Sequence, residues 1–292
     1  ICDMDGVIYH GNRILPGVAE FIQWLHDEDK EYLFLTNNSG YTPRELQQKL
    51  ARMGLDVPEE HFYTSALATA AFLRDQAPGC SVFAIGEAGL LNALYDAGIT
   101  MNDVNPDYVV VGEGRSYSLD TLTKATNLVM AGAKLIGANS DVSGPIEDGI
   151  APACRALVAP IEMATGKQAY FCGKPNPLMM RTGLRMLQCH SAEAVMVGDR
   201  MDTDVIAGIE TELDTVLVLS GVTSREMLAD FPYCPKYVLS GVGDIPRLYW
   251  MASAISPKRP KRKRLPPNSP YSMIKKTGCI PCSPSFYICK VF

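Results

Sequence analysis

The sequence predicts an α/β protein in which a doubly wound parallel sheet is interrupted by an inserted, smaller α/β cap domain. Two observations carry this prediction. Short apolar runs alternate with segments of helical period, and Pro78-Gly79 separates one such series from a second. With 292 residues and 47% apolar content, the chain can bury the cores of two domains. The expected division is a core of residues 1–78 and 169–250, a cap of 79–168 and a basic, disordered tail of 251–292.

The first part of the core shows clear helix and strand signals. Pro16 precedes apolar residues at helical spacing, and the apolar run 32–35 is typical of a buried parallel strand. The segment Thr42-Pro43-Arg44-Glu45 predicts a helix start, because it combines a capping box with proline at the first helical position. Only two residues precede the first acids, whereas strands typically run about five or six residues, so we expect the first strand to begin upstream of Ile1.

The cap and the second part of the core continue the alternation. The cap is expected to hold strands at 81–85, 108–111 and 134–137 with helices at 88–97 and 119–130. The stretch 139–152 has no apolar period and is expected to be a functional loop, after which a helix either starts near Pro160 or is kinked there. The core should then resume with strands at 169–172, 194–197 and 215–219 and helices from Pro177 and at 203–209.

Charge and composition narrow the class of function. Residues 251–292 carry nine Lys or Arg and no acid, which leaves 18 basic against 32 acidic side chains in residues 1–250. An acidic body argues against nucleic acid as a partner. No run approaches the roughly 18 apolar residues of a membrane span, and cysteines inside apolar segments indicate a reducing compartment. We therefore expect a cytoplasmic protein with no membrane partner; its oligomeric state is left open.

Four polar segments fall at the ends of predicted strands, where open α/β sheets bind ligands. The acids Asp3 and Asp5 stand two residues apart at the first strand and are candidates for a nucleophile and a general acid and base. Asp199 follows a later strand and would complete an oxygen-rich Mg²⁺ site with Asp3 and the carbonyl of Asp5. Asp204 either supports that site or binds the metal through water, while Asp202 is expected to cap the following helix.

The two remaining segments supply groups for a phosphate. Thr36 and Asn37 end a buried strand, and their hydroxyl and backbone N–H groups can hold phosphate oxygens. Lys174 follows another strand, where an ammonium is costly to bury unless it meets negative charge. Each signal alone is modest, since a turn, a helix cap or a solvent-facing lysine would explain it. Together they predict a magnesium-dependent phosphoryl-transfer site.

This set resembles the haloacid dehalogenase superfamily of phosphohydrolases, and the wording GKPNP and GDRMDTD with a cap between the second and third motifs resembles its NagD-type branch. The resemblance covers about residues 1–248. It implies Mg²⁺-dependent hydrolysis of ribonucleoside 5′-monophosphates such as UMP through an aspartyl-phosphate. Asn139 and Asp141 are the candidates for facing the leaving group. Arg155, Pro160 and Asn38-Ser39 differ from the sequences typical of this branch, and these differences concern the identity of the substrate.

Two other functions are compatible with the same residues. The nearest is a phosphatase of sugar phosphates, phosphoglycolate or pyridoxal phosphate, which differs only in the leaving group. From another class, the chain could be a non-catalytic phosphometabolite-binding protein. Dehalogenation is disfavoured because it needs no metal, whereas this chain keeps Asp5, Asp199 and Asp204.

Overall fold

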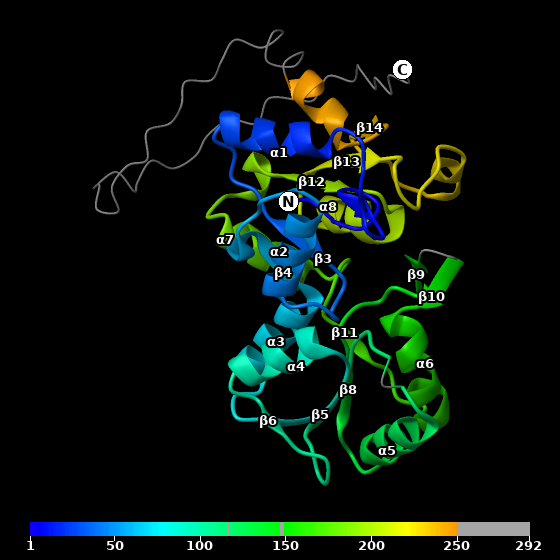
Figure 1. Ribbon diagram of the computed structural model, residues 1–292. Coiled ribbons are helices and arrows are strands. Elements are labelled where there is room, and N and C mark those ends of the chain that lie inside the picture. The colour runs from blue at the N-terminus through cyan, green and yellow to red at the C-terminus, as the bar shows by residue number, and fades with distance from the viewer. Residues whose placement is uncertain (116, 147–148, 250–292) are drawn as a thin grey trace, which may run out of the picture. The chain divides into compact units, whose positions relative to one another are not determined.

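The computed structural model describes residues 1–115, 117–146 and 149–249 (Figure 1). The chain divides into two compact units, Ile1–Ile245 and Pro246–Phe292, and the elements below lie in the first. The tail expected at 251–292 lies outside the described residues. None of the helices in the described ranges is long and apolar enough to cross a lipid bilayer.

The first sheet is parallel and is completed by the N-terminal segment. Strand β3 pairs with β4, and β12 pairs with β13, which pairs with β14. Cys2 forms parallel bridges to both Phe34 and Val197, so the N-terminal segment joins these two groups of strands. The strands are β3 (Phe34–Thr36), β4 (Phe62–Thr64), β12 (Val195–Gly198), β13 (Asp214–Val218) and β14 (Tyr237–Leu239).

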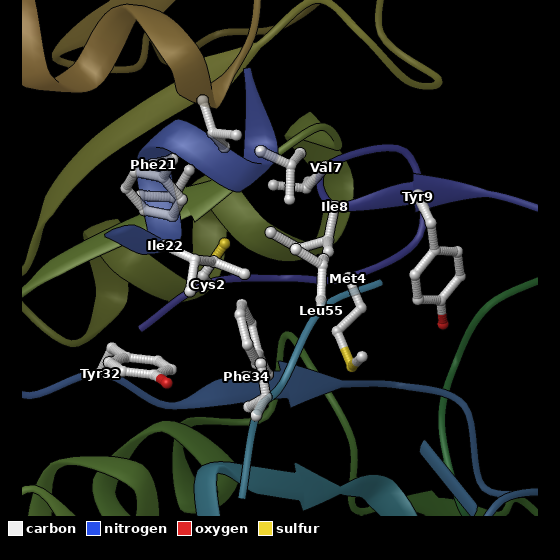
Figure 2. Close-up of a cluster of buried hydrophobic side chains, with 14 of the residues drawn as sticks. Cys2, Met4, Val7, Ile8, Tyr9, Phe21, Ile22, Tyr32, Phe34 and Leu55 are labelled. Atoms are coloured by element: carbon white, nitrogen blue, oxygen red, sulfur yellow. The ribbon is translucent and has the colours of Figure 1, made fainter. Parts of the chain in front are cut away.

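Side chains on opposite faces of this sheet enter different apolar clusters. Phe34 packs on one face with residues of α1 and α2, and Figure 2 shows its ring close to Cys2 and Met4. Its neighbours Leu33 and Leu35 pack on the other face with α7 and α8, as the two-residue period of a strand requires. The helices are α1 (Val18–Asp27), α2 (Pro43–Arg52), α7 (Pro177–Met186) and α8 (Ile206–Glu210).

A second, five-stranded parallel sheet follows the order β11-β8-β7-β5-β6. One face is covered by α3 and α4, which lie side by side, and the other by α5 and α6 (Figure 1). The strands are β5 (Ser81–Ile85), β6 (Thr100–Met101), β7 (Tyr108–Val111), β8 (Lys134–Gly137) and β11 (Tyr170–Phe171). The helices are α3 (Ser65–Gln76), α4 (Ala88–Asp96), α5 (Leu119–Met130) and α6 (Cys154–Thr165).

Two antiparallel hairpins and several short turns complete the fold. The stretch 139–152, expected to be a functional loop, contains a hairpin. Its residues do not alternate between polar and apolar, so the sequence pattern does not predict this pairing. The hairpins are β1 (Tyr9–His10) with β2 (Arg13–Ile14), and β9 (Ser143–Ile146) with β10 (Gly149–Pro152). The short helical turns are η1 (Glu59–His61), η2 (Ser191–Glu193), the π-helical η3 (Met201–Val205), η4 (Glu226–Asp230) and η5 (Val242–Asp244).

The structure confirms the fold class and corrects two details. The strand expected at 169–172 in the first sheet is β11, which pairs with β8 in the second sheet instead. Helix α6 runs through Pro160, so of the two alternatives the helix that starts near the proline is wrong. The missing N–H of Pro160 leaves the carbonyl four residues earlier without its helical bond. The division into core and cap at residues 78 and 168 stays a prediction.

Thr42→Ala should lower the free energy of unfolding by about 1 kcal/mol. The Thr42 side chain accepts a bond from the Glu45 N–H at 3.1 Å, and the Glu45 carboxylate accepts one from the Thr42 N–H at 2.8 Å, as the capping box predicts. Urea unfolding of both proteins measures the difference. Thr123→Ala, on the exposed side of α5, is the control and should leave stability unchanged or slightly higher. Equal losses in the two variants would contradict the prediction.

Candidate active site

Asp3 lies at the carboxyl end of the first sheet because the N-terminal segment pairs on both sides. The Asp3 N–H donates to the Val197 carbonyl at 2.8 Å, and the Leu35 N–H donates to the Cys2 carbonyl at 2.8 Å. The neighbouring strands β3 and β12 end at Thr36 and Gly198. Carboxyl ends of parallel strands share one edge of a sheet, so the Asp3 side chain lies beside the residues that follow those strands.

Lys174 is buried against two of these acids. Its side-chain ammonium donates to Asp3 Oδ1 at 2.5 Å and to Asp204 Oδ1 at 2.7 Å, and also to the Leu35 carbonyl at 2.9 Å. Only 1% of the residue is exposed. Lys174 therefore has the negatively charged neighbours that its burial requires. The strand that precedes it, β11, belongs to the second sheet.

Asp199 completes a group of three acids whose oxygens could hold a metal. Asp3, Asp199 and Asp204 each offer an oxygen within 4.8 Å of the others. Asp199 Oδ2 accepts from the Val222 N–H at 2.7 Å, whereas Oδ1 is buried with no hydrogen-bond partner among the described residues. A buried carboxylate oxygen left without a donor is costly unless it binds a cation. Oxygen ligands of this kind suit Mg²⁺, so the residues fit the group that the sequence predicts.

Gly6 keeps the space beside Asp199 open. Its φ is +77°, a conformation that favours glycine, and a Cβ there would lie 2.5 Å from Asp199 Oδ2. The glycine that follows the Asp3 and Asp5 pair thus serves both the turn and the close approach of a carboxylate.

Asp204 holds Lys174 and the chain that follows Asp199. Its Oδ1 accepts from the lysine and its Oδ2 from the Arg200 N–H at 3.1 Å. These contacts favour the supporting role over binding through water. Asp202 does not cap a helix as expected, because its carboxylate instead accepts two bonds from the Arg200 guanidinium, at 3.1 and 2.9 Å.

Asp5 lies next to the acids but has a different environment. The Tyr9 hydroxyl is 3.4 Å from Asp5 Oδ2, and Lys49 lies over the Tyr9 ring. Burial raises the pKa of the Asp5 carboxyl, and Lys49 offsets part of this shift. A carboxyl group that holds a proton more readily than usual suits a general acid.

Burial and mutual repulsion shape the ionisation of the central group. Burial raises the pKa of Asp3 well above its ordinary value, and the ammonium of Lys174 opposes this. Burial and the nearby Asp204 raise the pKa of Asp199 to about 7. Burial would lower the pKa of Lys174, but Asp204 and Asp3 raise it above the usual value, so the lysine stays charged. A divalent cation would favour the ionised carboxylates.

Thr36 and Asn37 lie at the same edge, but the Asn37 amide is used for structure. Asn37 Nδ2 donates to the Lys174 carbonyl at 3.0 Å and to Asp141 Oδ1 at 3.1 Å, and Asn37 Oδ1 accepts from the Lys174 N–H at 2.7 Å. Thr36 Oγ1 accepts from the Asn38 N–H at 3.1 Å. The Asn38 N–H is thus taken, and the Thr36 hydroxyl hydrogen and the Asn37 N–H are the better candidates for phosphate, since both residues line the cavity.

The structure separates the two expected cap residues. Asp141 lines the cavity, whereas Asn139 is fully buried and donates to the Asn37 carbonyl and to Glu113 Oε1, both at 2.5 Å. Asn139 thus joins the loops instead of facing a leaving group directly.

The acids open into a cavity of about 620 Å³ between the first sheet and the second. Its lining includes Asp3, Asp5, Thr36, Asn37, Asp141 and Asp199. It also includes residues that the sequence pattern did not single out as site residues, among them Glu113, Arg115 and Arg200. Glu113 and Arg115 lie in the GEGRSY segment and Arg200 lies in GDRMDTD. The sequence signal for these residues was the sequence of the whole segments, because no single residue in them indicated its role.

Comparison with known proteins identifies the class. Residues 1–100 match the family model of haloacid dehalogenase-like hydrolases, and residues 171–245 match a HAD-hydrolase-like model. Dihydroxyacetone phosphatase of Corynebacterium glutamicum is 45% identical over 245 residues, which cover 84% of this chain and 89% of that protein. The chain therefore belongs to the haloacid dehalogenase-like hydrolases.

Two further relatives specify the branch. Ribonucleotide monophosphatase NagD of Escherichia coli is 44% identical over 245 residues, 84% of this chain and 96% of NagD. Its solved structure has a TM-score of 0.78 over 83% of this chain and 96% of that one. A 4-nitrophenylphosphatase from Thermotoga maritima is 32% identical, with a TM-score of 0.81 over 84% and 95% of the two chains. This chain is of the NagD type, a phosphoric monoester hydrolase.

Asp141→Asn should raise the free energy of unfolding at pH 7 by on the order of 1 kcal/mol. Burial raises the pKa of Asp141 to about 6, with Arg200 and Asn37 opposing, so the folded state disfavours its ionised form. In the wild type the folded state takes up this proton first as pH falls, so stability from this group rises between about pH 6 and 4. The difference between the two proteins should therefore shrink over that range.

Urea unfolding at several pH values measures this difference. Asp75→Asn, at an exposed pair with Arg74, is the control and should show little change at any pH. A loss of stability in Asp141→Asn that is constant from pH 4 to 8 would show that the carboxylate is not disfavoured by burial.

Proposed function

We propose that this protein is a Mg²⁺-dependent phosphatase of small phosphomonoesters that works through an aspartyl-phosphate, with ribonucleoside 5′-monophosphates such as UMP as its preferred substrates. The observation that carries the proposal is the buried Lys174 ammonium, which bridges Asp3 and Asp204 beside the unpartnered Asp199 oxygen. Asp3 and Asp199 of this group line an open cavity. The arrangement has a nucleophile, a fixed positive charge and oxygen ligands within one site.

The proposed reaction uses Asp3 as the nucleophile and Asp5 first as general acid and then as general base. An Asp3 carboxylate oxygen attacks phosphorus, the bond to the leaving oxygen breaks, and Asp5 donates its proton to that oxygen. Asp5 then takes a proton from water, whose oxygen attacks the phosphorus of the aspartyl-phosphate and releases phosphate and Asp3. Lys174 holds Asp3 in place and offsets developing charge. When bound by Asp3, the Asp5 carbonyl and Asp199, Mg²⁺ would neutralise charge on the phosphate.

The Thr36 hydroxyl and the Asn37 N–H would hold the phosphate oxygens, and the cavity beside them would receive the leaving group. A volume of about 620 Å³ lies within the range of small-molecule sites and has room for a nucleoside. Glu113, Arg115 and Asp141 line this part of the cavity and offer hydrogen bonds to hydroxyl groups. The name of the related NagD supports a ribonucleotide.

Dihydroxyacetone phosphate is the second candidate substrate, because the relative of 45% identity is named for it. Phosphoglycolate and pyridoxal phosphate remain in the panel as nearest alternatives. We also propose a cytoplasmic location, which the free described cysteines support, and a free small molecule as partner rather than nucleic acid.

Asp3→Asn should lower turnover of p-nitrophenyl phosphate by a factor on the order of 10³ while inorganic phosphate still binds. The amide cannot act as the nucleophile but keeps the size of the side chain. Phosphate release in the presence of Mg²⁺, and after its removal with EDTA, measures the effect; EDTA should abolish turnover and added Mg²⁺ should restore it.

Asp214→Asn is the matched control, because its carboxylate pairs with Lys236 at the surface, and it should keep full activity. Retained turnover in Asp3→Asn would exclude Asp3 as nucleophile. A folded wild-type protein that binds phosphate without turning over any ester would favour the non-catalytic phosphometabolite-binding protein.

In a phosphate-release panel, UMP should show the highest kcat/KM, followed by dihydroxyacetone phosphate. Phosphoglycolate should be weaker, because its carboxylate would enter a cavity lined by Glu87, Glu113 and Asp141. A kcat/KM for dihydroxyacetone phosphate at least tenfold above that for every nucleotide would replace UMP as the preferred substrate and leave the phosphatase mechanism in place.

A further inference from the structure

Ser39 lies in the loop after β3 and fits between the loop after β7 and the first turn of α4. The residue is completely buried. A Cβ at Gly112, which follows β7, would lie 2.6 Å from Ser39 Oγ, and a Cβ at Gly89, in the first turn of α4, would lie 2.5 Å from the Ser39 carbonyl. The Gly89 N–H also donates to the Gly40 carbonyl at 3.0 Å. The absence of two side chains on the second sheet therefore makes room for this one serine.

Ser39 and Glu113 bind one another reciprocally. The Ser39 N–H donates to Glu113 Oε2 at 3.0 Å, and the Ser39 hydroxyl donates to the same oxygen. In return, the Glu113 N–H donates to Ser39 Oγ at 2.9 Å. Hydrogen bonds to a carboxylate are among the stronger ones in proteins, and this pair joins the two sheets at one point.

The other carboxylate oxygen of Glu113 extends the same contact to Asn37. Asn139 Nδ2 donates both to Glu113 Oε1 and to the Asn37 carbonyl. Both ends of the segment 37–39 are thereby tied to a single carboxylate of the second sheet. Within the loop, Thr36 Oγ1 accepts from the Asn38 N–H, and Asn38 Oδ1 accepts from the Gly40 N–H at 2.9 Å.

We infer that Ser39 and Glu113 are positioning residues, which hold the backbone of residues 36–39 in the orientation that binds the phosphate. The inference rests on the proposed function, in which the Thr36 hydroxyl and the Asn37 N–H of this loop bind the phosphate. The two residues act through the loop and need not touch the phosphate. Glu113 also lines the cavity, so the alternative is that it contacts the leaving group.

Inorganic phosphate separates these roles, because it occupies the phosphate site and has no leaving group. Its inhibition constant should rise about tenfold in Ser39→Ala and in Glu113→Ala, with a smaller rise in Glu113→Gln, whose amide oxygen can still accept from Ser39. KM for p-nitrophenyl phosphate should rise by the same factor, and kcat should change less. Combining Ser39→Ala with Glu113→Ala should cost no more than the worse single change, since both break the same contact.

The second sheet offers a matched control pair. The Ser81 N–H and hydroxyl donate to Asp107 Oδ2 at 2.7 and 2.9 Å, which repeats the Ser39–Glu113 chemistry at a place that does not line the cavity. Ser81→Ala and Asp107→Asn should leave the phosphate inhibition constant unchanged. Circular dichroism and thermal unfolding verify folding, and the near-isosteric Glu113→Gln keeps the test open if Ser39→Ala does not fold.

An unchanged inhibition constant in folded variants would overturn the inference, and so would an equal rise in the control variants. A rise in KM for UMP without a change for inorganic phosphate would assign Glu113 to the leaving group instead. Retained turnover in Asp3→Asn with weakened phosphate binding in the Ser39 and Glu113 variants would refute the proposed mechanism and leave this inference intact.

Discussion

The buried ammonium of Lys174 is the contact on which the rest of the site depends. Moving such a charge out of water costs several kcal/mol unless oppositely charged groups and hydrogen bonds replace the lost water. Asp3, Asp204 and the Leu35 carbonyl supply this replacement, and they come from three separate parts of the chain. The lysine thus fixes the N-terminal segment, strand β3 and the helical turn η3 around one point. Removing it would leave three acids within 4.8 Å of one another with no cation between them.

The same balance of charge explains why the site suits a divalent cation. One ammonium cannot neutralise three acids, and the Asp199 oxygen that faces no donor marks where the excess lies. The second sheet contributes differently, through uncharged amides and one carboxylate that tie the loop at 37–39. Ion pairs therefore fix the positions of the acids, whereas hydrogen bonds between loops fix the segment 37–39 beside them.

Much of the fold was predictable because local signals and periodicity agreed. Strands β5, β7 and β8 and helix α5 lie at the predicted residues, and the capping box at Thr42 starts α2 as expected. The proximity of Asp3 and Asp199 follows from one rule, that the carboxyl ends of parallel strands share an edge. That rule needs only that the strands are parallel, which the alternation of strands and helices predicts. Lys174 reaches them from a strand of the second sheet, which the rule does not cover.

What could not be predicted depends on contacts between distant residues. β11 is two residues long, and its pairing with β8 is decided by the second sheet and not by its own sequence. The hairpin at 143–152 lacks alternation, so only its cross-strand partners define it. The Asn37 side-chain amide binds Lys174 and Asp141, more than 100 positions away, and these contacts could not be read from its own segment. One unpredicted contact is local, because Asp202 binds Arg200, two positions away, instead of capping a helix.

The place of β11 has a mechanical consequence. The chain leaves the second sheet at Phe171 and reaches Lys174 only three positions later, through Cys172 and Gly173. Gly173 is tightly enclosed, with its N–H bound to the Ala138 carbonyl at 2.7 Å. No flexible linker separates the second sheet from Lys174. A displacement of that sheet would therefore also displace the ammonium that binds Asp3. The position of the second sheet and the position of the Asp3 nucleophile are thereby coupled.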